Sequence, residues 1–290
     1  MAPIKINSVK KILVPTDFSV SADNALSYAV ALAKNLSAKM TLFHSVRVPV
    51  SAAGELPEEF TPLNLQKEAT EHLECLQAQI RALNVPVEIE AETTVGLAVD
   101  EIISAVRTNN SELVVMGTRG ASGIMERIIG SNAAEVIQKA NCPVLVVPEE
   151  AKYKEIRRIV FATNYLDNDF QSLYLLVEMF KAFNAEIVVL HVREDTPGQE
   201  DEVENKLSEK FQQRVASSIP YDKFSFKVIN GRRVMECLNE FLENEGIDLL
   251  AVSTRRRNFI SKLFERGLTQ KLACHTRIPL LAFHSQQADV

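Results

Sequence analysis

The sequence contains no apolar run long enough to cross a membrane. Its longest runs, around Val115 and at residues 280–283, fall far short of the roughly 20 residues that a membrane-spanning helix requires. The opening segment MAPIKINSVKK also lacks the apolar core of a signal peptide. We therefore expect a cytoplasmic protein that has no membrane partner.

Cysteine is scarce, and a basic surplus is missing. No CxxC pair occurs and no histidine lies at zinc-finger spacing, which excludes a disulfide framework or structural zinc and suits a reducing cytosol. The net charge is −6. General nucleic-acid binding needs a strongly basic surface, so a nucleic-acid partner is not expected either. The four cysteines are Cys75, Cys142, Cys237 and Cys274.

What remains is the composition of an ordinary globular protein, with 46% hydrophobic and 24% charged residues. A length of 290 residues suggests two domains, each large enough to bury a core. The charge is uneven: residues 1–150 hold 12 Lys+Arg against 18 Asp+Glu, whereas residues 151–290 hold 20 of each. The two halves therefore present different surfaces.

Each half alternates short apolar strands with amphipathic helices. In the first half the pattern predicts a helix from Ser21 to Leu36, with Ser21 or Asp23 as its N-cap, and a strand over Val85–Glu92. It also predicts a strand over Leu113–Met116 and a helix over Asn132–Ala140. The second half repeats this order, with its first helix near Gln171–Phe183.

The two halves also match in sequence. RRIVFATNY, at residues 157–165, matches KKILVPTDF at an offset of 147, and VSTRR matches MGTRG at an offset of 136. A duplicated unit of about 145 residues is the simplest explanation. We predict two α/β domains, residues 1–150 and 151–290, each with an open, Rossmann-like parallel sheet. Ligands of such sheets bind beyond the carboxyl ends of the strands, after Val14, Val46 and Met116 in the first half.

A glycine pattern follows the strand that ends at Met116. It has the spacing G-x2-G-x9-G-S-N, from Gly117 and Gly120 to Gly130, Ser131 and Asn132. Gly117 and Gly120 can take positive φ and turn bare N–H groups toward an anion. Gly130 allows a tight turn, while Ser131 and Asn132 offer polar groups and N-cap geometry at a positive helix end. The pattern predicts a polyphosphate site; the alternative is a plain turn and a helix boundary.

Two common nucleotide motifs are absent, because neither GxxxxGK[ST] nor GxGxxG occurs. The sequence instead resembles the universal stress protein family in its tandem two-domain form. The residues that carry the resemblance are VPTD at 14–17, LFHSV at 42–46, the glycine pattern at 117–132 and CPVLVV at 142–147.

This resemblance implies an ATP-binding fold similar to the adenine-nucleotide hydrolases. It implies that Pro15, Thr16, Asp17 and Val46 hold adenosine, with Asp17 at or near the ribose, and that Met116 lies along the nucleoside. Gly117, Gly120, Gly130, Ser131 and Asn132 would surround the phosphates, whose oxygens would hold Mg²⁺, and no protein metal ligand or catalytic residue is assigned. Asp17 could instead be a helix cap or a turn residue, and Arg119 either a phosphate partner or a solvated charge.

The second half has lost these features. Asp17 becomes Asn164, Gly117 becomes Ser253, Gly120 becomes Arg256 and Gly130 becomes Arg266. We predict that this half does not bind ATP in the same manner. It is either a structural partner or an anion site built from Arg255, Arg256, Arg257 and Arg266, with or without Arg232 and Arg233, unless those arginines are merely solvated.

The two closing strands, over Val144–Val147 and Leu280–Phe283, are short and apolar. We expect them to face each other in an intramolecular pseudo-dimer, since exposed strand edges invite association. Further homodimerisation and the protein partner stay open. His44 and His191 occupy equivalent positions, 147 residues apart, which suggests a role in the fold.

The sequence favours an ATP-binding stress-response or signalling protein with slow or absent hydrolysis, because no general base is evident. One alternative is a true adenine-nucleotide hydrolase, although a loop such as SGGxDS is missing. Another is a nucleotide-independent interaction or holdase-like module that uses the proline-bearing segment Pro49–Pro62.

Overall fold

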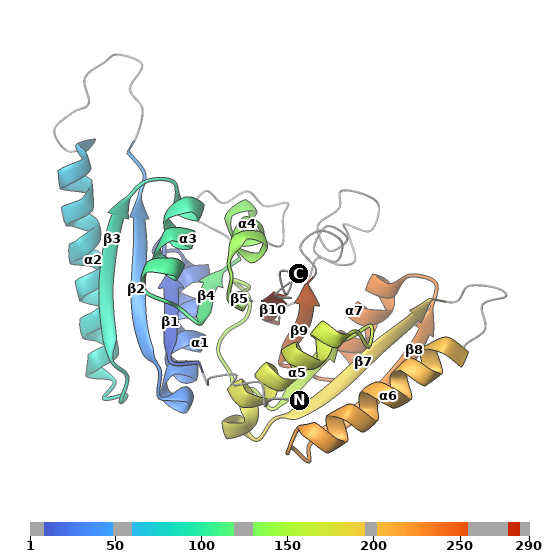
Figure 1. Cartoon of the computed structure of the whole chain (residues 1–290). Helices are drawn as coiled ribbons and strands as arrows, with labels where there is room; N and C mark the ends of the chain where they lie inside the picture. Colours follow the sequence, from blue (N-terminus) through green and yellow to red (C-terminus); the bar gives the residue numbers. More distant parts are fainter. Residues whose placement is uncertain (1–8, 49–59, 119–129, 195–201, 255–277, 285–290) are drawn as a thin grey trace. The chain divides into compact units, whose positions relative to one another are not determined.

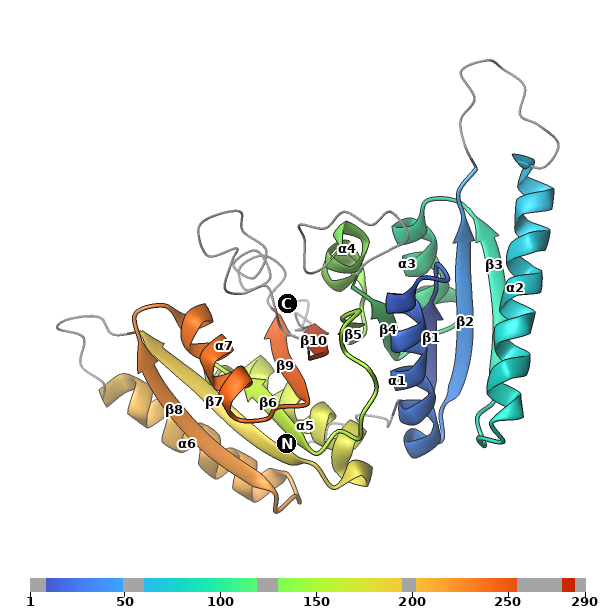
Figure 2. The ribbon, with the colours of Figure 1, turned by 180° about the vertical axis from the view of Figure 1, so that it is seen from behind.

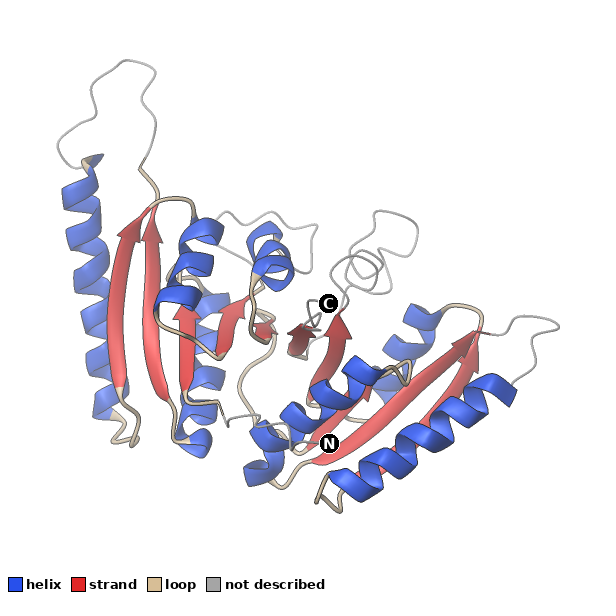
Figure 3. Cartoon of the chain, viewed as in Figure 1, coloured by secondary structure: helices blue, strands red, loops and turns tan. Residues whose placement is uncertain are grey.

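The computed structural model describes residues 9–48, 60–118, 130–194, 202–254 and 278–284. These residues form two compact units, one of which comprises Val9–Tyr153 while the other contains the chain from Lys154 onward. Each unit is a parallel sheet with helices on both faces (Figure 1 and, by secondary structure, Figure 3). The α/β fold predicted from the alternating pattern is confirmed, while the pairing of the two closing strands stays a prediction.

The strands of the first unit lie in the order β3-β2-β1-β4-β5 and are all parallel. Helices α3 and α4 pack together on one face, and α1 covers the opposite face, as Figure 1 and Figure 2 show together. The chain moves in one direction from β1 to β3 and in the other from β4 to β5, so the topological switch point lies between β1 and β4. The elements are β1 Lys11–Pro15, α1 Val20–Leu36, β2 Lys39–Val46, α2 Pro62–Ala82, β3 Ile89–Val95, α3 Ala98–Thr108, β4 Leu113–Gly117, α4 Ser131–Lys139 and β5 Val144–Val147.

The core of the first unit surrounds its central strands. Strands β4 and β5 are covered on both faces, which explains why their sequences are continuous apolar runs rather than alternating ones. Helix α1 turns a row of fully buried small residues, Ala25, Ala29 and Ala33, toward the sheet. Their spacing of four residues places them on one side of the helix, and their size allows a close approach. The rigid centre of the sheet thus supports the loops at its carboxyl edge.

The second unit repeats this plan in the order β10-β9-β6-β7-β8. Helices α5 and α6 lie on one face of its sheet and α7 on the other (Figures 1 and 2). Its elements are β6 Arg158–Ala162, α5 Asp167–Phe180, the 3₁₀ turn η2 Lys181–Phe183, β7 Glu186–Glu194, α6 Glu202–Ser218, β8 Phe224–Gly231, α7 Val234–Asn244, β9 Leu249–Thr254 and β10 Leu280–His284.

Two elements begin four residues away from their predicted starts. The third strand begins at Ile89 rather than Val85, because Pro86 has no N–H to donate and Asn84 takes a positive φ of 52°. The first helix of the second unit begins at Asp167 rather than Gln171. The carboxylate of Asp169 accepts the N–H of Leu166 at 3.2 Å, so the first turn is capped four residues earlier than the pattern indicated.

Both units anchor their first strand in the same way at the amino edge of the sheet. In the second unit, Asp248 precedes β9 and its Oδ2 accepts the N–H groups of Arg157 and Arg158, each at 2.9 Å. In the first unit, Glu112 precedes β4 and its Oε2 accepts the N–H groups of Lys10 and Lys11, at 2.5 and 3.2 Å. A carboxylate before the fourth strand therefore satisfies the amides that begin the first strand.

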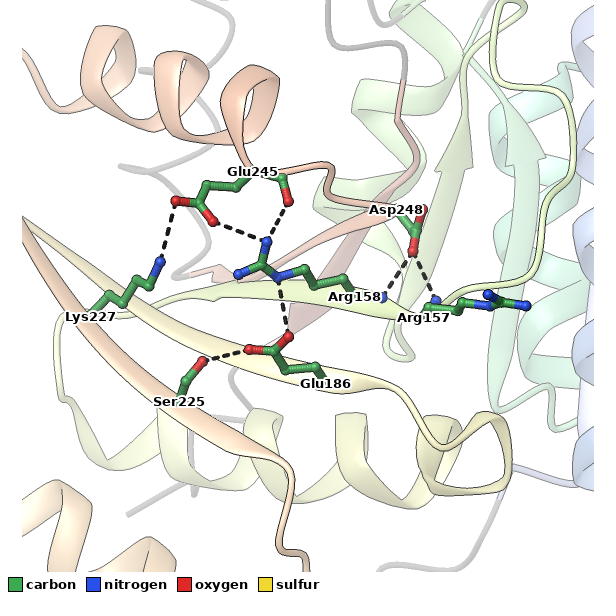
Figure 4. A network of polar contacts seen from close by, with 7 residues as sticks. All are labelled: Arg157, Arg158, Glu186, Ser225, Lys227, Glu245 and Asp248. Carbon is green, nitrogen blue, oxygen red and sulfur yellow. Dashed lines mark hydrogen bonds and ion pairs between the residues drawn. The ribbon is translucent and has the colours of Figure 1, made fainter.

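In the second unit this anchor belongs to a wider polar network (Figure 4). The Arg158 guanidinium lies 3.0 Å from Glu245 Oε2 and 3.2 Å from Glu186 Oε2. Glu245 also pairs with Lys227 at 3.3 Å, and Glu186 accepts the hydroxyl of Ser225 at 3.1 Å. The network joins the amino ends of β6 and β7 to β8 and to the end of α7.

Among the described residues, no helix is both long enough and apolar enough to cross a membrane.

Candidate functional site

The predicted site residues of the first unit lie at the carboxyl edge of its sheet. Pro15 ends β1, Val46 ends β2, and Gly117 ends β4. Ser131 and Asn132 begin α4, while Arg119 and Gly120 lie outside the described residues. Because β1 pairs with both β2 and β4, three of the predicted loops leave the sheet from neighbouring strands.

The turn after β1 is tightly bonded to itself. The Asp17 Oδ1 atom accepts the N–H of Ser19 at 3.2 Å and its hydroxyl at 2.6 Å. Ser19 is the N-cap of α1, and its side chain accepts the N–H of Ala22 at 3.3 Å. The predicted caps Ser21 and Asp23 are therefore wrong, because the helix begins at Val20, one residue earlier than expected. Asp17 supports the cap from outside the helix, as a turn residue does.

A histidine on β2 contacts the residues on both sides of Asp17. Thr16 donates its N–H to the carbonyl of Phe43 at 2.9 Å, and the Thr16 carbonyl lies 2.7 Å from His44 Nδ1. Phe18 takes a positive φ of 61°, and its N–H donates to Thr16 Oγ1 at 3.0 Å. Its ring lies 4.7 Å from the His44 ring and 5.2 Å from that of His72 on α2. Both neighbours of Asp17 are thus fixed by contacts.

The end of β2 packs against the turn that follows β3. Val46 is buried, and its carbonyl accepts the N–H of Gly96 at 3.0 Å. The hydroxyl of Ser45 donates to the Gly96 carbonyl, also at 3.0 Å. This ladder holds the backbone of Val46 at the same edge as the turn that carries Asp17.

The glycine at the end of β4 does not use the positive φ that its sequence pattern allowed. Among the described residues only Gly246 is a glycine with positive φ, so Gly117 does not use the left-handed region. A Cβ atom on Gly117 would lie 2.2 Å from Ser21 Oγ and 2.8 Å from the Ser21 carbonyl carbon. Gly117 therefore allows β4 to end directly against the first turn of α1. Met116, just before it, is buried.

The second glycine region also differs from the prediction. Gly130, rather than Ser131 or Asn132, is the N-cap of α4, and no side chain caps this helix. The N–H of Gly130 donates to the Thr118 carbonyl at 2.5 Å, and Thr118 N–H donates to the Val147 carbonyl at 3.0 Å. Ser131 and Asn132 lie exposed in the first turn, whose N–H groups form the positive end of the helix.

Two carboxylates interact at this edge, Asp17 in the turn and Asp23 in the first turn of α1. Burial raises the pKa of Asp23 above its ordinary value, and the charge of Asp17 raises it further. Two such groups favour a cation or hydrogen-bond donors nearby over a bare anion. Across the described part of the chain, no group of three or more His, Cys, Asp or Glu residues could hold a metal ion.

The second unit keeps the turn and changes its chemistry. Asn164 takes the place of Asp17, and Asp169, whose counterpart is Ala22, lies buried beneath the turn. Its Oδ2 accepts the Thr163 hydroxyl at 2.8 Å and the Asn164 N–H at 2.9 Å. A buried carboxylate therefore accepts from the donors of this turn, whereas no carboxylate is buried in the described part of the first unit. Nothing in the sequence pattern distinguished Asp169 from an exposed helix-start acid.

The second unit also replaces the close contact that Gly117 makes at the end of β4, here at the equivalent strand β9. Ser253 replaces Gly117, and Asn168 replaces Ser21. The Asn168 Nδ2 atom donates to Ser253 Oγ at 2.9 Å, so the extra side chain is accommodated by a hydrogen bond. The predicted arginine cluster, at 255–257 and 266, lies outside the described residues.

The fold and this edge define an open α/β protein whose loops gather at the switch point of a parallel sheet. The universal stress protein family matches the sequence twice, at residues 8–148 and 155–284. The chain therefore belongs to the universal stress protein family, in a tandem form, and the resemblance drawn from its motifs is confirmed.

Individual relatives match one repeat at a time. A universal stress protein of Methanocaldococcus jannaschii is 32% identical over 152 residues, covering 50% of this chain and 86% of that protein. The Bacillus subtilis universal stress protein YxiE is 33% identical over 144 residues, covering 47% and 97%. A crystal structure of a universal stress protein from Archaeoglobus fulgidus matches both repeats. Its TM-score is 0.70 at 18% identity, with coverage of 94% of this chain and 96% of that one, which supports the fold.

Proposed function

We propose that the first unit binds ATP with Mg²⁺ and that the second unit does not bind it in the same manner. The observation that carries this proposal is the position of the asymmetry. In the first unit Asp17 follows β1 and Gly117 ends β4, the two strands that flank its switch point, where the second unit has Asn164 and Ser253. Ligands of open parallel sheets bind at such points.

The proposed contacts divide between the two sides of the switch point. On the β1 and β2 side, Pro15, Thr16, Asp17 and Val46 hold the adenosine, with the Asp17 carboxylate accepting a ribose hydroxyl. On the β4 side, Met116 lies along the nucleoside. The phosphates lie against the chain from Gly117 to Asn132, where the first turn of α4 supplies N–H groups and a positive dipole.

The metal ion is held mainly by phosphate oxygens. Mg²⁺ commonly binds through substrate phosphates and water, with few protein ligands. It would also offset the negative charge of Asp17 and Asp23 beside a triphosphate. Without a general base positioned for attack on the γ-phosphate, the chain binds nucleotide and hydrolyses it slowly or not at all. Binding would act as a cytoplasmic stress-response signal that a protein partner detects.

Isothermal titration calorimetry with ATP and Mg²⁺ tests the proposal. The wild type should bind one ATP per chain. Asp17→Asn should weaken binding roughly tenfold to hundredfold, because the side chain loses its negative charge and one of its two accepting oxygens. Asparagine keeps an oxygen that can accept the bonds from Ser19, so the turn survives the change. Gly120→Arg, which copies Arg256, should also abolish or greatly weaken binding.

The chain offers a matched control in its second repeat. Asn164→Asp makes the reverse change at the equivalent position and should leave the affinity unchanged. A wild type that releases no heat and protects no peptide from proteolysis with ATP would favour a nucleotide-independent interaction module instead. Multiple turnovers per minute would favour a true hydrolase.

A further inference from the structure

His44 contacts the residues on both sides of Asp17 and does not itself belong to the predicted ligand set. A carbonyl oxygen can only accept, so the 2.7 Å contact with Thr16 requires that His44 Nδ1 carries the proton and donates it. Thr16 N–H already donates to the carbonyl of Phe43, the residue before His44. Two successive residues of β2 thus bind the N–H and the carbonyl of Thr16, which directly precedes the carboxylate.

The other contact is with the residue that follows Asp17. Phe18 has a φ of 61°, a conformation that is unfavourable for a bulky L residue unless its surroundings hold it there. The His44 ring lies 4.7 Å from the Phe18 ring at a tilt of 33°, and His72 meets the same ring edge-on. One imidazole therefore fixes the direction in which the chain enters and leaves residue 17.

The second unit repeats this arrangement around a different central residue. His191 Nδ1 lies 2.8 Å from the Thr163 carbonyl, and Tyr165 has the same φ of 61°. The Tyr165 and His191 rings are 4.7 Å apart at a tilt of 37°. The central residue there is Asn164. The histidine geometry is thus independent of the carboxylate: the histidine shapes the turn, and residue 17 or 164 supplies the chemistry.

We infer that His44 is a positioning residue for nucleoside recognition, acting through Asp17, and this inference rests on the proposed function. The Nδ1–H bond and the ring contact hold the turn so that the Asp17 carboxylate faces the ligand before the ligand arrives. If the turn has to become ordered when the ligand binds, the entropy cost of ordering it weakens ligand binding. Loss of the His44 contacts should therefore weaken nucleotide binding without any direct contact being removed.

Two substitutions separate the two contacts of the imidazole. His44→Phe keeps a ring beside Phe18 and removes the donor, while His44→Asn keeps a donor near the Nδ1 position and removes the ring. We expect His44→Phe to weaken ATP binding roughly three- to tenfold, which is the effect of one lost hydrogen bond. His44→Asn should recover part of that loss. His191→Phe, the matched change in the second unit, should leave ATP affinity within about twofold of the wild type.

A double-mutant cycle with Asp17→Asn distinguishes positioning from general loss of structure. If His44 acts through Asp17, His44→Phe should change the ATP affinity of the Asp17→Asn chain by less than about twofold. Additive effects in the cycle, or equal losses from His44→Phe and His191→Phe, would overturn the inference. So would a His44→Phe chain with wild-type affinity. A wild type that binds no ATP would instead overturn the proposed function, and this inference with it. If His44→Phe does not fold, the same cycle is measured with His44→Asn.

Discussion

Replacement of Gly117 by alanine would drive a methyl group into the first turn of α1. The added Cβ would lie 2.2 Å from Ser21 Oγ and 2.8 to 2.9 Å from the Ser21 carbonyl atoms. The side chain could rotate, but the backbone of Ser21 cannot move without shifting α1, and this residue is buried. Overpacking of this kind costs about 1–3 kcal/mol. We expect the upper part of that range, because the obstacle is backbone.

Two other glycines serve as comparisons. The three atoms nearest to a Cβ on Gly96 all belong to the side chain of Glu101, 2.5 to 2.8 Å away. This side chain can rotate away, although it then loses the 3.0 Å hydrogen bond that it accepts from Thr94. A Cβ on Gly246 would meet no atom within 4 Å, but the φ of this residue is +61°. Its replacement by alanine therefore costs only torsional strain, about 1 kcal/mol.

Native-state hydrogen exchange, followed by mass spectrometry, measures each unit separately. Gly117→Ala should lower the opening free energy of peptides from β1 and β4 by about 2–3 kcal/mol, and Gly96→Ala by less than about 1 kcal/mol. Removing the Ser21 hydroxyl in the Ser21→Ala/Gly117→Ala chain should restore only part of the loss, because the backbone contact remains. Equal losses from Gly117→Ala and Gly96→Ala would refute this explanation of the glycine.

Two further predictions concern titratable groups. Burial raises the pKa of the Cys142 thiol to about 12, so at pH 8 iodoacetamide should modify exposed Cys75 in the folded protein and leave Cys142 unmodified; mass spectrometry checks this, and equal labelling would contradict it. Glu245 has a pKa below its ordinary 4.5, first through its hydrogen bond from Lys227 and then through Arg158. A carboxylate whose pKa is lower in the folded protein stabilises the fold at pH values above its unfolded-state pKa. This stabilisation is lost as the pH falls through its folded-state pKa. Urea unfolding should therefore show Glu245→Gln to be less stable than the wild type at pH 7, with the difference shrinking below about pH 4.5; a difference that is constant with pH would contradict the assignment.

The fold could be predicted from the sequence because local patterns determine it. The apolar runs of β4 and β5 are long enough to mark strands buried on both faces, and the repeat doubled the evidence for each element. Boundaries failed where a single residue competed with the pattern. Pro86 delayed the third strand, and the Asp169 carboxylate advanced the start of α5, although neither residue interrupts the periodicity that indicated these elements.

The position of the candidate site could be predicted from the sequence, but the contacts that form it could not. The end of β1 and the end of β4 carry the residues that differ between the repeats, so comparing the halves pointed to Asp17 and Gly117. The sequence did not indicate which residues Asp17 and Gly117 contact. The approach of Gly117 to Ser21 joins residues 96 positions apart, and it depends on how closely α1 packs on the sheet. An alanine row in α1 allowed that closeness, but no sequence rule gave its distance.

The most direct test of the account is to find which repeat holds the nucleotide. The wild-type protein would be irradiated with 8-azido-ATP and Mg²⁺, digested, and analysed by mass spectrometry to locate the modified peptides. The account predicts that the label falls within residues 9–153, that unmodified ATP competes it away, and that Asp17→Asn reduces it. Label that falls mainly in peptides after residue 154 and is displaced by ATP would contradict it.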